Sequence, residues 1–136
     1  MARALLNVEK NIIRASLGND LISIIDHCEH THIRVPPNSV IRISTMLSSN
    51  DDLLFSTLMD SFAVDMTDKE EENKFELYYH LYSKKLNKRI FITTEIGNEA
   101  IHSLTVVFEN INWYEREMFD MFGIKFSRHP DLRAIY

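Results

Sequence analysis

The sequence contains few of the residues that most cofactor sites require. Its 136 residues include one cysteine, Cys28, and three widely separated glycines, Gly18, Gly97 and Gly123. A single thiol cannot form an internal disulfide, and it cannot supply the about four protein ligands, mostly thiolates, of an iron–sulfur cluster. Three scattered glycines cannot form the G-x-G-x-x-G or G-x-x-x-x-G-K loop of a nucleotide site. The sequence therefore predicts no NADH, flavin or iron–sulfur site in this chain.

Long apolar runs and a basic surface are also missing. No run approaches the about 20 apolar residues that span a bilayer, and the N-terminus lacks the apolar segment of a secretory signal. The net charge of −5 argues against nucleic-acid binding, which usually needs a basic stripe. A chain that is 45% hydrophobic and 26% charged can bury a core without disulfides or a metal. We expect one globular domain over residues 1–136.

Hydrophobic periodicity predicts an α+β fold. Helical spacing predicts a first helix that ends at Gly18 and a second over residues 40–47. Strands are predicted over residues 21–25, 31–35, 53–65, 75–82 and 89–95. The strand over residues 53–65 is expected to be covered on both faces, with a bulge near Asp60. The last two strands are expected to form an antiparallel hairpin. Residues 103–108 fit either a short helix or a strand. The order α-β-β-α-β-β-β, followed by a C-terminal helix and turn, predicts two layers with helices on a mixed or antiparallel sheet.

The C-terminal helix is the best marked, over residues 112–122. Asn112 is expected to cap its N-terminus, and Glu115 stands three residues later, which gives a capping-box arrangement. Gly123 is expected to end the helix, because glycine readily adopts the left-handed conformation of that position.

The polar residues of this helix have two interpretations. Arg116 and Asp120 are four residues apart and can pair on one helix face, while Trp113, Glu117 and Asp120 lie along one side. Two neighbouring acids could serve general acid–base catalysis. A charged stripe beside aromatic residues is more often a salt-bridged interface or a solvated face, and no nucleophile, metal or cofactor loop accompanies these acids.

A second cluster, within residues 27–32, could bind a metal. In an extended segment Cys28, His30 and His32 share one face, and their side chains are zinc-type ligands. Structural zinc sites usually take ligands from two separated clusters, and the sequence has no second one. We therefore favour a polar turn between two strands and keep metal binding as the alternative.

Three groups of residues near the C-terminus together resemble the signature of the complex I 30-kDa-subunit family. They are Glu115-Arg116-Glu117, then Asp120-Met121-Phe122-Gly123-Ile124, then His129-Pro130-Asp131-Leu132-Arg133. Residues 58–65, 75–83 and 87–93 resemble strands of the same family, so the resemblance covers most of the chain from about Val35 onward. The family often has Gly where this chain has Arg128 and a second Arg where it has Ala134. Family members usually continue past Tyr136 with a basic, proline-containing tail.

This resemblance implies a non-redox structural and assembly subunit in the peripheral arm of a proton-pumping NADH:quinone oxidoreductase (complex I). It implies partners in the large quinone-site subunit and the neighbouring iron–sulfur subunits. NADH, FMN, iron–sulfur clusters and quinone would belong to those partners, and this chain would hold no cofactor, metal or catalytic residue. The implied location is peripheral, on the cytoplasmic face of a bacterial inner membrane or the matrix face of a mitochondrial one.

The signature residues are the candidate site, and the resemblance implies that they form a subunit interface. They are Glu115, Arg116, Glu117, Asp120, Gly123, His129, Pro130, Asp131 and Arg133. Two other functions stay open: the equivalent subunit of a membrane-bound hydrogenase or another quinone- or cofactor-reducing complex, and a free-standing metal-binding or acid–base enzyme.

Overall fold

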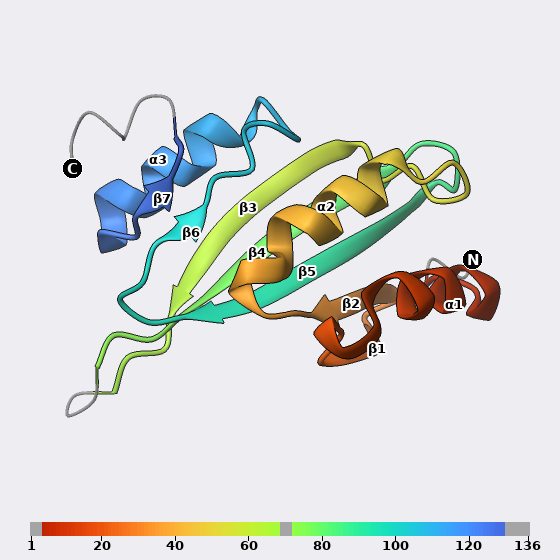
Figure 1. Ribbon diagram of the computed structural model, residues 1–136, viewed down its shortest axis with the longest axis horizontal. Helices are drawn as coiled ribbons and strands as arrows, with labels where there is room; N and C mark the ends of the chain where they lie inside the picture. Colours follow the sequence, from red (N-terminus) through yellow and green to blue (C-terminus); the bar gives the residue numbers. More distant parts are fainter. Residues whose placement is uncertain (1–3, 69–71, 130–136) are drawn as a thin grey trace.

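The computed structural model describes residues 4–68 and 72–129, which form a mixed sheet with helices against it (Figure 1). The elements in chain order are α1 (Asn7–Leu17), β1 (Ser23–His27), β2 (His30–Arg34), α2 (Val40–Ser49), β3 (Thr57–Asp65), β4 (Phe75–Ser83), β5 (Lys88–Ile96), β6 (Ile101–His102), α3 (Ile111–Phe122) and β7 (Phe126–Ser127). Two short 3₁₀ turns, Gly18–Asp20 and Pro37–Ser39, follow α1 and precede α2. The predicted α+β class and the order of its main elements are confirmed.

The main sheet has the strand order β1-β2-β5-β4-β3. β2 and β5 are parallel, whereas the other neighbouring pairs are antiparallel. Cys28 and Glu29 form the turn between β1 and β2, both with positive φ angles of 50° and 67°, as in the two-residue turns that suit a hairpin. The sheet is therefore mixed, and β3 lies at one edge.

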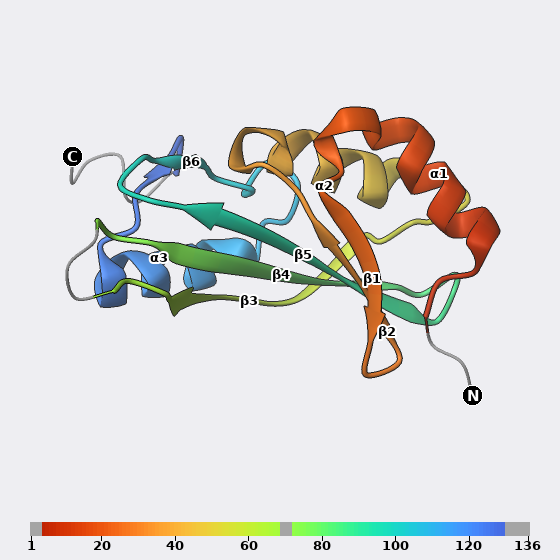
Figure 2. The same cartoon turned by 90° about the horizontal axis from the view of Figure 1, so that it is seen from below.

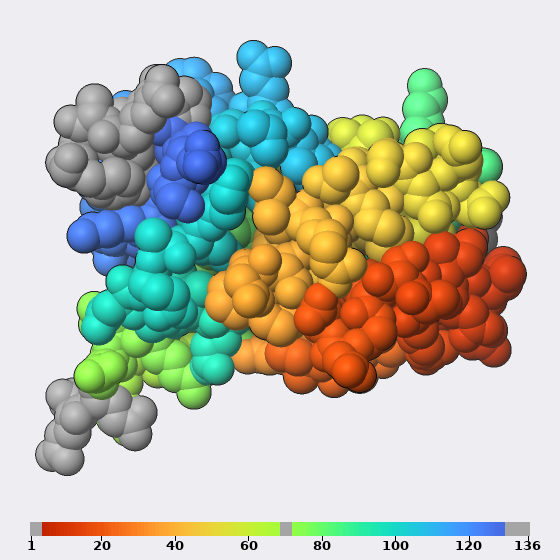
Figure 3. Space-filling model, in the orientation of Figure 1, coloured from red at the N-terminus to blue at the C-terminus, as the bar shows by residue number. Residues whose placement is uncertain are grey.

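The core lies between this sheet and the helices on one of its faces, as Figure 2 shows for α1 and α2. Alternate residues of β4 are buried, which is the half-buried strand that its sequence predicts. In the space-filling view α1 and α2 lie side by side on the right-hand part of the near surface (Figure 3). The fully buried side chains include Ile13 of α1, Ile43 and Leu47 of α2, Leu77, Tyr79 and Leu81 of β4, and Ile90 and Ile92 of β5.

The prediction for residues 53–65 is partly wrong. The strand begins only at Thr57, because Leu53 and Phe55 are buried in the loop after α2, where the Phe55 N–H donates to the Leu47 carbonyl at 2.8 Å. β3 is not covered on both faces, since Phe62 and Val64 are exposed. The predicted bulge is confirmed by a register shift between Leu58 and Asp60.

Residues 103–108 form neither a helix nor a strand. They make a turn in which the N–H groups of Val107 and Phe108 donate to the Leu104 carbonyl at 2.9 and 2.8 Å. Just before this turn, β6 pairs in parallel with β7, a small second sheet that the periodicity did not predict. Two-residue strands are too short to show a period, so only the folded chain reveals them.

Candidate functional site

Helix α3, which carries Glu115, Arg116, Glu117 and Asp120 of the signature, lies beside the edge strand β3 (Figure 1). Its buried residues, Ile111, Glu115 and Met118, recur every three to four positions, so they lie on one face. At its C-terminal end the Phe122 ring packs against the Phe75 ring of β4, with centroids 5.4 Å apart. This buried face fixes which of the signature side chains point outward.

Glu115 lies on that buried face and does not cap the helix. α3 begins at Ile111 after Asn110, with no side-chain hydrogen bond from that capping position. Glu115 is fully buried and accepts hydrogen bonds from the Ser103 hydroxyl at 2.6 Å and the Leu104 N–H at 2.9 Å. The predicted capping box of Asn112 and Glu115 is therefore wrong, because the helix starts one residue before Asn112.

The Glu115 carboxyl group is held in an environment that disfavours its charge. Burial raises the pKa of Glu115 from 4.5 to about 7, and the hydrogen bonds from Ser103 and Leu104 oppose that rise. The Tyr79 hydroxyl of β4, also fully buried, has no hydrogen-bond partner among the described residues, and burial raises the pKa of Tyr79. The carboxyl group thus connects α3 to the segment after β6 at a site from which water is excluded.

His129, from the last signature group, comes to the same place. Its side chain is fully buried, and its Nε2 lies 3.3 Å from the Asn112 carbonyl oxygen and 3.8 Å from Glu115 Oε1. The first distance fits a hydrogen bond in which Nε2–H donates to the carbonyl. Glu115 and His129, which are 14 positions apart in the sequence, thus lie close together in the fold, and the signature alone did not predict this.

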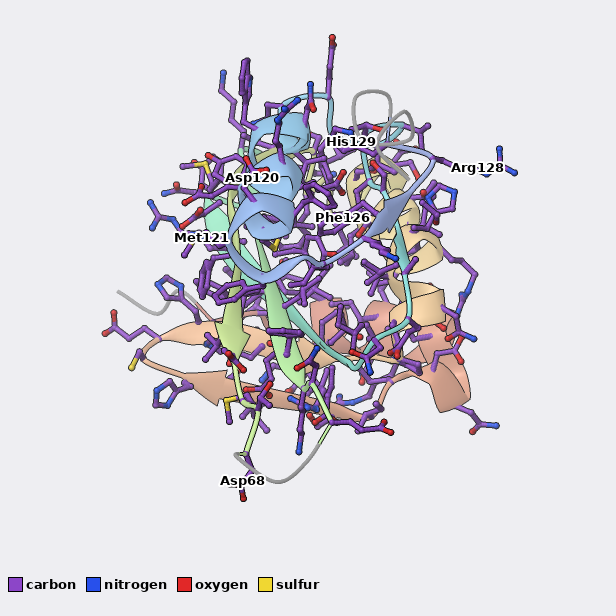
Figure 4. The ribbon with its side chains drawn as sticks, turned by 90° about the vertical axis from the view of Figure 1, so that its left-hand side faces the viewer. Asp68, Asp120, Met121, Phe126, Arg128 and His129 are labelled. Atoms are coloured by element: carbon purple, nitrogen blue, oxygen red, sulfur yellow. The ribbon has the colours of Figure 1, made fainter. Side chains whose placement is uncertain are left out.

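The three other charged signature residues of α3 face solvent. Arg116, Glu117 and Asp120 are exposed, and among the ion pairs of the described residues none joins Arg116 to Asp120. The expected pairing of these two side chains is therefore wrong in this structure. Trp113 is 76% exposed and Met121 64% exposed on the same helix. Figure 4 shows Met121 and His129 on opposite flanks of α3, with Asp120 on its outer side.

The end of α3 follows the prediction. Gly123 has a φ of +72°, and its N–H donates to the Phe119 carbonyl at 2.8 Å, as expected for a glycine that ends a helix.

Arg128 also has a positive φ, 63°, at the position where the family often has glycine. The remaining signature residues, Pro130, Asp131, Leu132 and Arg133, lie outside the described residues.

The structure separates the three side chains of the candidate metal cluster. Cys28 is exposed in the turn after β1, so it does not continue the strand face of His30 and His32. The His32 ring stacks on Phe91, with centroids 4.7 Å apart and an interplanar angle of 9°. Within residues 4–68 and 72–129 no group of three or more His, Cys, Asp or Glu is placed to hold a metal ion.

The groups that surround Glu115 could not be found from the sequence. Ser103 and Leu104 precede Glu115 by 12 and 11 residues, and Tyr79 lies on β4, so no local pattern connects these residues to the helix.

In the described part of the chain, no helix has both the length and the apolar character of a bilayer-spanning segment.

Similar sequences come from respiratory enzymes. The family model described as "Respiratory-chain NADH dehydrogenase, 30 Kd subunit" matches residues 33–136. The C subunit of NADH-quinone oxidoreductase from Paramagnetospirillum magneticum is 35% identical over 136 residues, which are 99% of this chain and 67% of that protein. The C subunit from Parvibaculum lavamentivorans is 43% identical over 98 residues, 71% of this chain and 48% of that protein. The chain spans about half to two thirds of the length of these relatives.

Solved structures share the fold. A trypsin-resistant fragment of Nqo5 superposes with a TM-score of 0.67 at 22% identity, covering 91% of this chain and 98% of that one. A chain of the membrane-bound sulfane sulfur reductase, an archaeal respiratory membrane complex, gives a TM-score of 0.67 at 17% identity, covering 90% and 72%. At these identities the likeness concerns the fold. The family model and the closer sequence relatives show more: the chain belongs to the family of the 30-kDa subunit of the respiratory-chain NADH dehydrogenase.

Proposed function

We propose that this chain is a structural and assembly subunit in the peripheral arm of an NADH–quinone oxidoreductase. The observation that carries the proposal is its 35% identity, over 99% of its length, to a protein named as the C subunit of such an enzyme. The surface assigned to assembly is the outer side of α3 with Arg116, Glu117 and Asp120, and its partner is the large quinone-site subunit. Arg133 belongs to the same proposal but lies outside the described residues.

Some signature residues are buried and others are exposed, and this difference supports the assignment. Glu115 and His129 are buried and hold α3 in place, whereas Arg116 and Asp120 are exposed and contribute little to the fold. They stand beside the exposed Trp113, and aromatic residues and arginine are enriched at protein interfaces. Exposed charges have small effects on stability, about 0–1 kcal/mol, while removal of one partner of a buried charge pair costs roughly 3–5 kcal/mol. Arg116 and Asp120 should therefore matter mainly when a partner covers them.

The experiment compares assembly with stability. Arg116→Ala and Asp120→Ala would each be introduced into the complete enzyme, which is examined on native gels, and into the lone chain, which is unfolded thermally. We expect reduced assembly with little change in the unfolding of the lone chain. Arg14→Ala on the exposed side of α1 is the matched control and should assemble normally. Normal assembly of both α3 variants, or unfolding of the lone chain, contradicts the proposal.

The same proposal assigns the chemistry to other subunits. NADH, FMN, the iron–sulfur clusters and the quinone would be bound by partners, and this chain would carry no catalytic residue. It would reach the membrane only through the complex, on the cytoplasmic face of a bacterial inner membrane or the matrix face of a mitochondrial one.

A second candidate is the equivalent subunit of another respiratory complex. It is favoured by the shared fold of a chain in an archaeal sulfane sulfur reductase, a membrane-bound respiratory complex. Mass spectrometry of the subunits that co-purify with this chain distinguishes the two. NADH-binding and quinone-site subunits support the first candidate, whereas hydrogenase-type or sulfur-reducing subunits support the second.

A further inference from the structure

A small groove lies between α3 and the free edge of β3. It is lined by residues 60–63 of the strand and by residues from the middle and C-terminal half of the helix, and its volume is about 210 Å³. Sites for small molecules and cofactors usually occupy about 300–1,000 Å³. The groove is therefore too small for such a ligand and has the scale of one or two side chains.

The walls of the groove are apolar and open to solvent. Phe62 on the strand is exposed, although its ring stacks on Tyr78 at a centroid distance of 5.0 Å, and Met121 on the helix is largely exposed. Figure 4 places Met121 on the flank of α3 away from His129. Two exposed apolar residues that line one hollow are more typical of an interaction site than single apolar side chains scattered over a surface.

The charge of the groove has one sign. Asp60 and Glu117 are its charged lining residues, and no lysine or arginine lines it. Arg116 precedes Glu117, and successive helix residues are about 100° apart around the axis, so its side chain leaves the helix in a different direction. An acidic rim beside an apolar hollow favours an incoming cation and disfavours an incoming acid.

A buried hydroxyl lies beneath the groove. Ser61 lines the groove and is 4% exposed, and its Oγ has no hydrogen-bond partner among the described residues. The Ser61 N–H is already used, since it donates to Asp60 Oδ1 at 2.8 Å. The Ser61 hydroxyl is closed off from solvent, so an occupant of the groove would contact the exposed lining side chains instead.

We propose that this groove receives one apolar side chain of a neighbouring subunit, next to an arginine or lysine of the same segment that pairs with Asp60 and Glu117. This inference rests on the proposed function, because it names the chemistry of a partner at the α3 surface. The apolar side chain packs into the hollow beside Met121, and the cation neutralises the acidic rim.

Photo-crosslinking in the assembled enzyme tests the occupant directly. p-Benzoylphenylalanine would replace Met121, and in a matched control it would replace Ile22, which is 59% exposed and precedes β1. We expect an adduct at position 121 with a segment of another subunit that has Arg or Lys within two positions of an apolar residue. An adduct with an acidic segment, with lipid or with a second copy of this chain overturns the inference, as does the absence of any adduct in the assembled enzyme.

A competition measures the energetic effect. Wild-type and variant chains would be co-expressed, and their ratio in the purified enzyme compared with their ratio in the cells by mass spectrometry. Met121→Ala and Glu117→Lys should each reduce the variant share by about fivefold or more, because they remove an anchoring side chain or place like charges together. Ile22→Ala should leave the ratio unchanged.

The two proposals fail in different ways. If Arg116→Ala and Asp120→Ala reduce assembly while the two groove variants compete normally, the groove inference is wrong and the proposed function stands. If the wild-type chain does not co-purify with the enzyme at all, both are wrong.

Discussion

The buried Glu115 carboxyl group gives the sharpest test of the structure, through the substitution Glu115→Gln. Glutamine keeps the shape of the side chain and an oxygen that accepts the Leu104 N–H, but it does not ionise. The groups around this position are the Ser103 hydroxyl, the Leu104 N–H, the His129 imidazole and the Tyr79 hydroxyl. The variant therefore removes one titration from the site and preserves most of the packing.

The size of the effect follows from the pKa of Glu115, which rises from 4.5 to about 7 on folding. One pKa unit corresponds to about 1.4 kcal/mol, so this difference is worth about 3 kcal/mol. Between these two pH values the folded state binds the proton more tightly than the unfolded state does. The stability that Glu115 contributes is therefore fully present below pH 4.5 and is lost as the pH rises through 7.

The assay is urea unfolding of the wild-type chain and of Glu115→Gln at about pH 5 and about pH 7.5. Other groups titrate in this range, but they do so in both proteins and cancel in the comparison. Between the two pH values the wild type should lose about 2 kcal/mol more of its free energy of unfolding than the variant loses. The difference in stability between variant and wild type should therefore shift in favour of the variant as the pH rises from about 5 to about 7.5.

Two results would refute this reasoning. If wild type and variant lose the same stability between the two pH values, Glu115 does not titrate in that range and is charged in its buried site. If the variant instead loses more stability than the wild type as the pH rises, the sign of the linkage is opposite, and folding does not raise the pKa of Glu115.

Three further predictions concern the backbone, the metal cluster and the chemistry. Gly123→Ala should lower the free energy of unfolding in urea by about 1–2 kcal/mol, because a residue with a Cβ is strained at a φ of +72°. The added Cβ meets nothing within 4 Å, so this backbone strain is the whole of the expected cost. Arg128→Gly should not destabilise the chain to that extent. Elemental analysis should find no stoichiometric zinc; about one zinc per chain, lost when Cys28, His30 and His32 are replaced by Ala, would contradict this. The purified chain should be colourless and should not oxidise NADH, so a bound flavin spectrum would count against the proposed function.

The sequence predicted those elements whose pattern is local. In β4, alternation between Phe75 and Leu81 matches a strand with one buried face, and the structure places these residues in the core. Gly123 ends α3 because the left-handed position favours glycine, and this can be predicted from the adjacent helix alone. Period and turn chemistry are properties of neighbouring residues, so they can be read before the fold is known.

Predictions that depended on distant neighbours were wrong. The apolar residues of both parities in residues 53–65 suggested a strand covered on two sides, but Leu53 and Phe55 are buried in a loop, and Phe62 and Val64 are exposed on an edge strand. Composition shows that a segment must bury apolar surface, but it does not show which other elements will cover it. That depends on the strand order, which places β3 at the edge of the sheet.

The role of Glu115 shows the same limit in a single residue. A glutamate three positions after a polar residue fits a capping box, and such a contact does occur in α1, where Glu9 accepts from the Leu6 N–H at 2.8 Å. In α3 the helix begins one residue before the expected cap, so Glu115 falls on the buried face. Its partners, Ser103 and Leu104, lie in a turn that the periodicity did not define.

Three consecutive signature residues therefore have to be tested for three different properties. A helix turns by about 100° per residue, so Glu115, Arg116 and Glu117 cannot face the same surroundings. Glu115 points into the core, Arg116 is exposed, and Glu117 lines the groove beside β3. A substitution at Glu115 that abolishes assembly says nothing about an interface unless the lone chain is shown to remain folded. At Arg116 and Glu117, where the side chains contribute little to the fold, loss of assembly with unchanged unfolding is direct evidence for a partner.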